Sequence, residues 1–335
     1  MSSKPTIENI SKATGFSPAT ISRVLNHPEL VNDNTRIKVI NAMRDLGYKQ
    51  TQRSPSPDKG SSKGLIVIEV PWLDNPFYSE IIRGIQVSAT AKGYDVSICW
   101  THGSELDIRR FVNLCNYTQA SGTIVLSPME ESTLLELESI CPVVQCCEFN
   151  PAVASIPYVT IDDYSAARKA IEYLVACGCS KLSILRGPTT FKYARERYRA
   201  FMDVVEEKQL EFKKEWICKI PDNSYDLAYA DACNLLAGPA LPDAIFCCSD
   251  IFAAAAIAAA GKYQINVPNQ LQVIGFDNIE ISKMLVPALT TVSQPRYQMG
   301  FTAASLLLQR MKDVSTPDQI SLEAQLIIRG STLAK

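Results

Sequence analysis

A short stretch near the N-terminus has the residue types and spacing of a helix that binds DNA. Ser17 can act as an N-cap, and Pro18 can occupy the first helical position. A helix that enters the major groove, which is about 12 Å wide, needs small or hydrogen-bonding side chains on its leading face. Arg23 lies on that face and could donate to O6 and N7 of one guanine together. The candidate DNA-binding residues in this stretch are Ser17, Pro18, Ala19, Thr20, Ser22, Arg23 and Asn26.

Two flanking helices are expected to position this stretch. Thr6 can cap a first helix that Gly15 would end, and Gly47 would end a third helix over about residues 32–46. Thr6 and Thr35, near the starts of these two helices, are further candidates for contact with DNA. The side chains expected to pack inside the unit are Ile7, Ile10, Ala13, Ile21, Val24, Leu25, Ile37, Ile40, Ala42, Met43 and Leu46. The pattern predicts a helix-turn-helix unit, and the alternative is a three-helix module that binds protein.

Charge is divided unevenly along the chain. Residues 1–63 contain 10 of the 33 Lys and Arg and 5 of the 35 Asp and Glu, which gives this segment a net charge of +5. The rest of the chain therefore carries −7 within a total of −2. A basic segment joined to an acidic one favours a nucleic-acid-binding module attached to a part that avoids polyanions. A solvated charged surface is the alternative.

From Gly64 onward, apolar runs with strand character alternate with amphipathic helical segments. This alternation predicts an α/β fold with two Rossmann-like lobes, each built on a parallel sheet with helices on both faces. The expected strands lie at residues 65–70, 95–100, 122–126, 143–147, 158–161, 182–185, 216–220, 244–247, 272–275 and 321–329.

Three regions follow from these patterns. We expect a helix-turn-helix DNA-binding domain at 1–49 and an effector-binding and dimerisation domain at 64–335. Lobe 1 of that domain would comprise about 64–162 and 295–322, and lobe 2 about 163–292 and 325–335. Between the two domains, Pro55 and Pro57 disfavour a helix, and Gly60 begins a Gly-Ser-Ser stretch typical of flexible linkers. Residues 50–63 are therefore expected to form a flexible linker.

Ligands of open α/β sheets bind at the carboxyl ends of the strands. The candidate effector-binding residues in or near such positions are Phe77, Tyr78, Ser127, Asp162, Arg197, Ser249 and Asp277. Aromatic rings can stack on a ligand ring, while an arginine and an aspartate supply the donor and acceptor that hold sugar hydroxyls. Each residue also has a structural alternative: the two rings could be core, and Arg197 could pair with Glu196 or Asp203. A neighbouring candidate, Asp250, could be an N-cap.

Composition argues against other classes. The longest apolar runs are far below the roughly 20 residues needed to span a bilayer, and the N-terminus has no apolar stretch typical of a secretory signal. We therefore expect a cytoplasmic protein without a membrane partner. The 11 cysteines are expected to be reduced, and the 2 histidines lie near no cysteine pair or evident nucleophile. Neither a metal ion, a cofactor nor enzymatic activity is expected, because dinucleotide, P-loop and hydrolase motifs are also missing.

The N-terminal sequence from Thr6 to Asn26 resembles the headpiece of the lactose/galactose repressor family, as do Val-Asn-Asp-Asn-Thr-Arg at 31–36 and Leu-Gly-Tyr at 46–48. The remainder of the chain carries motifs similar to the effector domain of the same family. These motifs are Asn-Pro-Phe-Tyr-Ser-Glu-Ile at 75–81, Cys-Ser-Asp at 248–250, Val-Ile-Gly-Phe-Asp-Asn at 273–278, Pro-Ala-Leu-Thr-Thr-Val-Ser-Gln-Pro at 287–295 and Ile-Ile-Arg-Gly-Ser at 327–331.

The resemblance implies a periplasmic-binding-protein type of fold and a repressor that binds double-stranded operator DNA as a homodimer. It implies that Pro18, Ala19 and Arg23 read bases. Since Pro18 and Ala19 offer only apolar contact to thymine, specificity should depend mainly on Arg23. It also implies that Phe77, Tyr78, Arg197 and Asp277 contact the effector. The stretches at 75–85, 274–279, 294–297 and 325–332 are similar to a cytidine-responsive member, so the expected inducer is a nucleoside, cytidine. The expected partner is the cyclic-AMP receptor protein, and the expected location is the nucleoid.

The sequence also departs from the family pattern. Residues 50–63 lack the leucine that family members insert into the minor groove, and no leucine-heptad tail follows Ser331, which favours a dimer over a tetramer. Purine-binding relatives have Arg and Thr where Phe191 and Tyr193 stand here, which argues against a purine effector. The alternatives that stay open are a repressor of the same family that responds to a sugar or purine, and a ligand-binding receptor without a DNA function.

Overall fold

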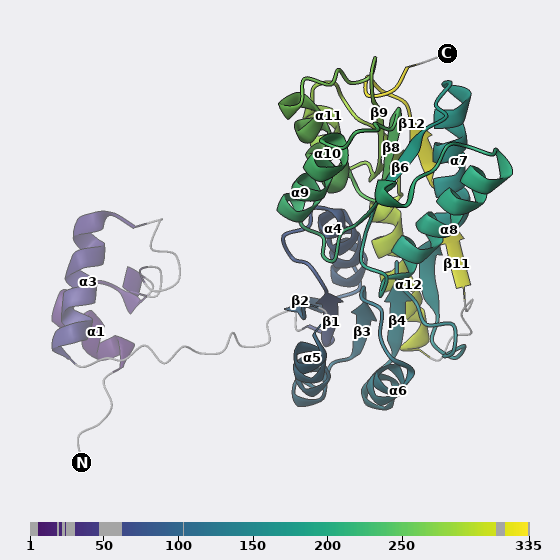
Figure 1. The fold of residues 1–335 in the computed structure, drawn as a ribbon. Coiled ribbons are helices and arrows are strands. Elements are labelled where there is room, and N and C mark those ends of the chain that lie inside the picture. Colours follow the sequence, from purple (N-terminus) through teal and green to yellow (C-terminus); the bar gives the residue numbers. More distant parts are fainter. Residues whose placement is uncertain are drawn as a thin grey trace. The chain divides into compact units, whose positions relative to one another are not determined.

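The computed structural model describes residues 6–18, 20–21, 24, 31–46, 62–102, 104–312 and 319–333. The chain divides into a small unit that ends at Ser61 and a large unit that begins at Ser62 (Figure 1). Several predictions from the sequence lie outside the described residues: those for Ala19, Ser22, Arg23, Leu25, Asn26 and Gly47, and those for residues 50–61 of the expected linker.

Short-range hydrogen bonds set the helix ends of the small unit. The Thr6 amide and hydroxyl both donate to Asn9 Oδ1, at 2.8 and 2.7 Å, at the start of α1 (Ile7–Thr14). Gly15 ends α1 with φ +74°, and its amide donates to the Ser11 carbonyl. Ser17 Oγ accepts from the Thr20 amide at 3.2 Å, so a second helix starts where the sequence predicts it.

The packing of the third helix, α3 (Asp33–Asp45), differs from the sequence prediction. Ile37 and Ile40 are 52% and 44% exposed, and Leu46 and Ala13 are exposed as well. Val39 is fully buried instead, and it packs with Ala42 and Met43 against Ile10, Ile21 and Val24. Helical spacing explains the difference, because Val39, Ala42 and Met43 are related by three and four positions and share one face. The prediction is therefore correct for Ala42 and Met43 and wrong for Ile37, Ile40 and Leu46, which lie on the other side of the helix.

The large unit contains two lobes, each with a six-stranded sheet. The first sheet has the strand order β11-β5-β4-β3-β1-β2, and the second β12-β10-β9-β8-β6-β7. The elements of the first lobe are β1 (Leu65–Val70), α4 (Phe77–Thr90), β2 (Asp95–Trp100), α5 (Glu105–Tyr117), β3 (Gly122–Val125), α6 (Glu131–Ile140), β4 (Val143–Cys146), β5 (Tyr158–Ile161), α12 (Arg296–Arg310) and β11 (Gln319–Leu322).

The second lobe contains the remaining elements. They are α7 (Asp163–Ala176), β6 (Leu182–Arg186), α8 (Lys192–Glu207), the 3-10 turn η2 (Lys214–Trp216), β7 (Ile217–Lys219), α9 (Tyr225–Leu236), β8 (Ala244–Cys247), α10 (Asp250–Lys262), β9 (Gln272–Asp277), α11 (Ile281–Met284), β10 (Thr290–Ser293) and β12 (Gln325–Ile327). All strand pairs are parallel except the antiparallel pair of β10 and β12. The predicted α/β fold is confirmed.

One predicted strand is wrong. The run at 321–329 was expected to be continuous, but it divides into β11, which pairs with β5, and β12, which pairs with β10. The strand pattern is unbroken across this run, yet its two ends join different sheets, so residues 323–324 cross between the lobes. The chain crosses at two other places, between β5 and α7 and between β10 and α12.

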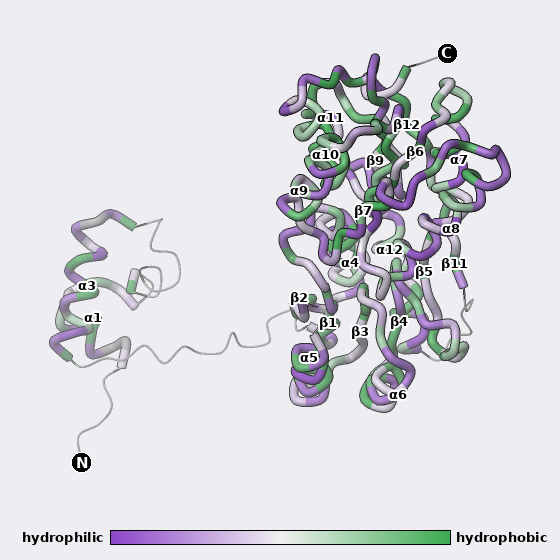
Figure 2. The backbone as a smooth tube through the Cα atoms, in the orientation of Figure 1, coloured by the Kyte–Doolittle hydropathy of each residue, from purple (hydrophilic) through white to green (hydrophobic). Residues whose placement is uncertain are grey.

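Helix packing in the first lobe brings two backbones into close contact. A Cβ at Gly300 of α12 would lie 1.9 Å from the Ile81 carbonyl oxygen of α4, and one at Gly84 would lie 2.2 Å from the Tyr297 carbonyl oxygen. Only glycine permits this approach. On the outer helix α5, hydrophobic and hydrophilic residues alternate along the tube (Figure 2), because Phe111, Val112 and Cys115 face the core.

No helix among the described residues has both the length and the apolar content that crossing a membrane requires.

Candidate functional site

A cavity lies where the two lobes meet. Residues of both lobes and of the strands that cross between them line it: Trp72, Asn75, Phe77, Tyr78, Cys147, Glu148, Ile161, Asp163, Tyr193, Arg197, Asn223, Cys248, Ser249, Asp277, Gln294 and Met299. A concave site lined by aromatic side chains and a few polar groups is typical of a small-molecule site.

The first lobe supplies an aromatic wall. Phe77 and Tyr78 begin α4, and Asn75 Oδ1 accepts from the Phe77 amide at 3.0 Å, which fixes the turn before the helix. The two rings meet edge to face with centroids 5.1 Å apart. Burial raises the pKa of Tyr78 well above its usual value, so its hydroxyl stays protonated. The predicted alternative that these rings belong to the core is also partly correct, because both are buried while lining the cavity.

Arg197 of α8 lies at the centre of the polar side. Its Nε and Nη2 donate to Asp163 Oδ1 at 3.0 and 2.7 Å, and its Nη1 donates to the Cys248 carbonyl oxygen at 2.6 Å. The guanidinium also stacks 3.4 Å from the ring centroid of Phe276 and 4.7 Å from that of Tyr193. Every one of these contacts holds the planar group in one orientation, so Arg197 is a rigid part of the cavity wall.

The two partners suggested for Arg197 by sequence proximity are not its partners. Glu196 pairs with Arg199, and Asp203 accepts from the Tyr164 hydroxyl at 2.8 Å. Both acids lie on other faces of α8, whereas Asp163 reaches Arg197 from the start of α7.

Asp277 is the second polar group of the wall. Gln294 Nε2 donates to its Oδ1 at 2.7 Å, and Arg197 Nη1 lies 3.7 Å from the same oxygen. Burial raises the pKa of Asp277 to about 6, although the charges of Arg197 and Arg296 oppose the rise. The carboxyl group therefore titrates close to neutral pH.

The backbone at Asp277 is strained and is held from several sides. Asp277 has φ +112° and Asn278 has φ +52°. Asp250 Oδ2 accepts from the Ile279 amide at 2.8 Å, and Arg329 Nη2 donates to Asn278 Oδ1 at 2.7 Å. Asp250 is thus a buried anchor for this turn, while the N-cap of α10 is its neighbour Ser249. Such clusters of strain are typical of functional sites.

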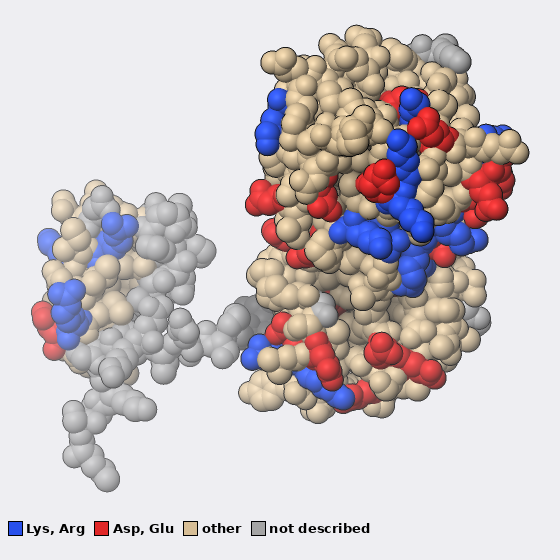
Figure 3. Space-filling model, viewed as in Figure 1, with Lys and Arg blue, Asp and Glu red and all other residues tan. Residues whose placement is uncertain are grey.

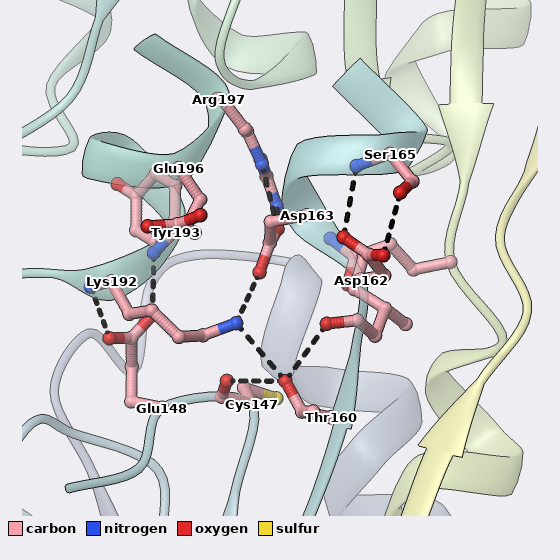
Figure 4. Close-up of polar contacts among 12 residues, drawn as sticks. Cys147, Glu148, Thr160, Asp162, Asp163, Ser165, Lys192, Tyr193, Glu196 and Arg197 are labelled. Atoms are coloured by element: carbon pink, nitrogen blue, oxygen red, sulfur yellow. Dashed lines mark hydrogen bonds and ion pairs between the residues drawn. The ribbon is translucent and has the colours of Figure 1, made fainter. Parts of the chain in front are cut away.

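Five of the seven predicted effector-binding residues line the cavity: Phe77, Tyr78, Arg197, Ser249 and Asp277. Asp162 does not, because its carboxylate caps α7 and accepts from the amide and hydroxyl of Ser165 at 2.9 and 2.6 Å. The next residue, Asp163, points into the polar network instead (Figure 4). The residues that the sequence reasoning missed include Trp72, Glu148, Asp163, Tyr193, Asn223 and Gln294. Two local signals pointed to members of this set: the pair of adjacent aspartates after a strand, and Tyr193, which stands where purine-binding relatives have Thr.

Ser127 is also placed outside this cavity. Its hydroxyl donates to the buried carboxylate of Glu69, and its amide donates to Glu69 Oε2 at 3.0 Å. Glu69 further accepts from the Thr101 hydroxyl at 2.5 Å and from the Leu126 amide at 3.1 Å. Ser127 therefore provides hydrogen bonds to a buried carboxyl group of β1, which the position of a serine after a strand could not reveal.

The described DNA-binding candidates lie at helix starts of the small unit. Ser17 and Pro18 are exposed, and the Ser17 and Thr20 hydroxyls lie 2.9 Å apart in a hydrogen bond. Thr6 is exposed at the start of α1, and Thr35 is partly buried in α3. Ser17 thus has a structural role as a cap, and its exposed hydroxyl can donate to a phosphate oxygen when Thr20 is the donor in the hydrogen bond between the two hydroxyls.

A helix-turn-helix unit, joined in one chain to two parallel-sheet lobes around a polar cavity, is the domain combination of a DNA-binding transcriptional regulator. Residues 6–50 match the model of bacterial regulatory proteins of the lacI family, and residues 171–332 match the periplasmic binding protein-like domain. The chain belongs to the LacI family of DNA-binding transcriptional repressors.

Similarity to individual relatives extends along nearly the whole chain. The HTH-type transcriptional repressor CytR of Escherichia coli is 32% identical over 334 residues, which cover 98% of this chain and 96% of the relative. The ribose operon repressor of Halalkalibacterium halodurans is 31% identical over 331 residues, covering 98% and 97%. The solved lac repressor dimer bound to operator and an anti-inducer has a TM-score of 0.73 at 24% identity, covering 99% of this chain and all of that one, which shows a shared fold.

Proposed function

We propose that this repressor responds to a nucleoside, with cytidine as the expected inducer. The observation that supports this most is the pairing, in one cavity, of the aromatic wall at Phe77 and Tyr78 with the buried polar groups of Arg197 and Asp277. An aromatic wall suits the flat face of a base, and a carboxylate suits the hydroxyls of a ribose. The choice of cytidine among nucleosides rests on the sequence resemblance.

The charges of the cavity favour an uncharged ligand over a phosphorylated one. Among the described residues that line it, Arg197 is the only cation, and Glu148, Asp163 and Asp277 are acids. Arg197 already donates to Asp163 and to a carbonyl oxygen. Other Lys and Arg side chains gather on the outer surface of this unit (Figure 3). A phosphate would therefore be desolvated next to carboxylates without a free cation, which is unfavourable.

A sugar effector is the second candidate, because one relative of similar identity is a ribose operon repressor. A free sugar would use Arg197 and Asp277 but would leave the buried aromatic wall without a ring of comparable area to stack on. The two candidates therefore differ in whether the base contributes to affinity.

A thermal-shift series separates these candidates, because a ligand of the native state raises the melting temperature by mass action. The series compares cytidine, uridine, adenosine, ribose and cytidine 5′-monophosphate. We expect stabilisation by cytidine and little by ribose or the monophosphate. An equal shift with ribose alone would replace the nucleoside by a sugar, and recovery of unchanged cytidine by chromatography would exclude turnover.

We also propose that the protein binds its operator as a homodimer. The strand β2 lies at the edge of the first sheet, and its side chains Ile98 and Trp100 are 43% and 44% exposed. Exposed apolar side chains on a sheet edge favour association. Ile98→Glu should convert the dimer to a monomer in sedimentation equilibrium, whereas Tyr117→Glu, at an exposed position on α5, should not. An unchanged dimer in Ile98→Glu would place the interface elsewhere.

The reading of bases by Arg23 and the cooperation with the cyclic-AMP receptor protein are part of the same proposal. On an operator selected from random DNA, Arg23→Ala should weaken specific binding by about 1–3 kcal/mol. Cytidine should dissociate a ternary complex with the cyclic-AMP receptor protein more readily than the binary complex with DNA. If cytidine dissociated the ternary and the binary complex equally, the proposed coupling between cytidine binding and the contact with the cyclic-AMP receptor protein would be wrong.

A further inference from the structure

The first turn of α8 is capped by a side chain from the opposite lobe. Glu148, just after β4, accepts from the Lys192 amide through Oε2 at 2.5 Å and from the Tyr193 amide through Oε1 at 3.2 Å (Figure 4). Glu148 is only 3% exposed. We call this pair of hydrogen bonds the interlobe cap. It places a carboxylate at the positive end of a helix, where both the orphan amides and the helix dipole favour it.

The other long helices of the second lobe are each capped by the residue that directly precedes them. Asp162 caps α7, Ser224 caps α9 and Ser249 caps α10, each by accepting from the amide three residues later. The N-cap residue of α8 is Phe191, whose side chain makes no capping hydrogen bond, and the first turn of α8 contains no acid. Thus α8 depends on another part of the chain for the acceptor that its neighbours carry in their own sequence.

The same end of α8 carries further contacts between the lobes. The ring of Phe191 stacks on Trp72 of the first lobe with centroids 4.5 Å apart. Lys192 Nζ lies 3.2 Å from Thr160 Oγ1 in the first lobe and 2.6 Å from Asp163 Oδ2 in the second. The contacts of Phe191 with Trp72 and of Lys192 with Thr160 form only while the lobes stay together, so they are lost if the cleft opens.

We propose that Glu148 is a positioning residue that holds the two lobes closed, because it caps the first turn of α8 from the opposite lobe of the same chain. Opening the cleft removes the cap, and α8 is also the helix that carries Tyr193 and Arg197 into the cavity. Lobe closure is therefore coupled to the stability of the helix that presents the ligand-binding groups. The consequence for effector affinity rests on the proposed function, whereas the coupling between closure and the cap does not.

A direct ligand contact is the competing role for Glu148, since this residue also lines the cavity. Both of its carboxylate oxygens are engaged by α8 amides, which favours the positioning role. The two roles differ in the ligand-free protein, because a pure ligand contact has no effect on closure before the ligand binds.

Trp72 fluorescence in the ligand-free full chain tests the proposal. The emission of Trp72 is taken as the difference between each protein and its Trp72→Phe partner, with acrylamide quenching as a second readout of exposure. Loss of a helix cap corresponds to about a tenfold change in the ratio of open to closed molecules. We expect Glu148→Ala to move the emission to longer wavelength and to increase quenching, and Glu148→Gln, which keeps one acceptor oxygen, to lie between Glu148→Ala and the wild type.

Ser224→Ala is the matched control, because it removes the cap of α9 within the second lobe and no contact between lobes. It should leave Trp72 emission unchanged. Emission and quenching of Glu148→Ala equal to those of the wild type would overturn the proposal, as would an equal response in Ser224→Ala. If Glu148→Ala does not fold, the same comparison is made with Glu148→Gln. Since no ligand is present, a failure of cytidine to bind the wild type would defeat the proposed effector and leave this test intact.

Discussion

Arg197 donates two hydrogen bonds to a single oxygen of Asp163, and both side chains are almost completely buried. The pair connects α8 with the start of α7, and the two residues are 34 positions apart in the sequence. Buried pairs of this kind contribute little net stability, but removal of one partner leaves an uncompensated charge. The pair therefore fixes the geometry of the cavity, and breaking it should lower the stability of the protein strongly.

Arg197→Ala should lower the free energy of unfolding by about 3 kcal/mol, because Asp163 stays buried and Lys192 compensates only part of its charge. Arg197→Lys should not restore effector binding, since an ammonium cannot reproduce the planar fork. Urea denaturation and calorimetry measure the two effects. Arg199→Ala on the same helix is the control, because Arg199 is 56% exposed and its surface pair contributes at most about 1 kcal/mol. Equal losses in the two variants would contradict this account.

Asp277 should make stability and effector affinity depend on pH in opposite directions. Its pKa of about 6 in the folded protein exceeds the usual 3.8. The folded state therefore holds this proton more tightly, and the stability that the group contributes below pH 4 is lost as the pH rises to 6. If the carboxylate accepts hydrogen bonds from effector hydroxyls, effector affinity should instead rise up to pH 6 and then level off.

Asp277→Asn isolates these effects. Asp250 is also buried with a raised pKa, so only the difference between the wild type and this variant reports on Asp277. From pH 4.5 to 7.5, urea denaturation should show the stability of the wild type falling with pH, and calorimetry should show its effector affinity rising. Both pH dependences should be weaker in the variant. A wild-type affinity that stays constant across pH 6 would remove the Asp277 carboxylate from effector binding.

Gly300→Ala should lower the free energy of unfolding by about 1–3 kcal/mol, because the new methyl group would meet backbone atoms of α4. Gly261→Ala is a matched substitution in α10, where no atom lies within 4 Å of the added methyl group. It should stabilise the protein by about 0.5–1 kcal/mol through helix propensity. Urea midpoints compare the two, and destabilisation by both would show that helix contact is not the cause.

Gly15→Ala should weaken DNA binding without changing effector binding. The residue has φ +74°, a conformation that costs an L side chain about 1–2 kcal/mol, and no neighbouring atom obstructs the added methyl group. The cost is therefore conformational and confined to the small unit. Gly15→Asn should retain more affinity, because asparagine tolerates this conformation. DNA titration and effector calorimetry on the same preparations separate the two activities.

Local patterns in the sequence predicted the local structure well. Thr6, Gly15 and Ser17 act at the helix ends where their types place them, and the alternation of strands and helices from Gly64 predicts the α/β fold. Caps, turns and hydrophobic periods depend on residues a few positions apart, so one sequence contains the information. The resemblance to a family predicts effector contacts for Phe77, Tyr78, Arg197 and Asp277, and these four residues share the cavity.

Relationships between distant residues were decided by the tertiary structure. Spacing along the chain suggested Glu196 or Asp203 for Arg197, but the partner is Asp163, and a uniform strand-like run at 321–329 joins two different sheets. The capping of α8 by Glu148 has no signal in either local sequence. Close packing brings such groups together only when both lobes are folded. Because an unpaired buried charge is unfavourable, the packed structure that forms is one in which each buried charge has a partner.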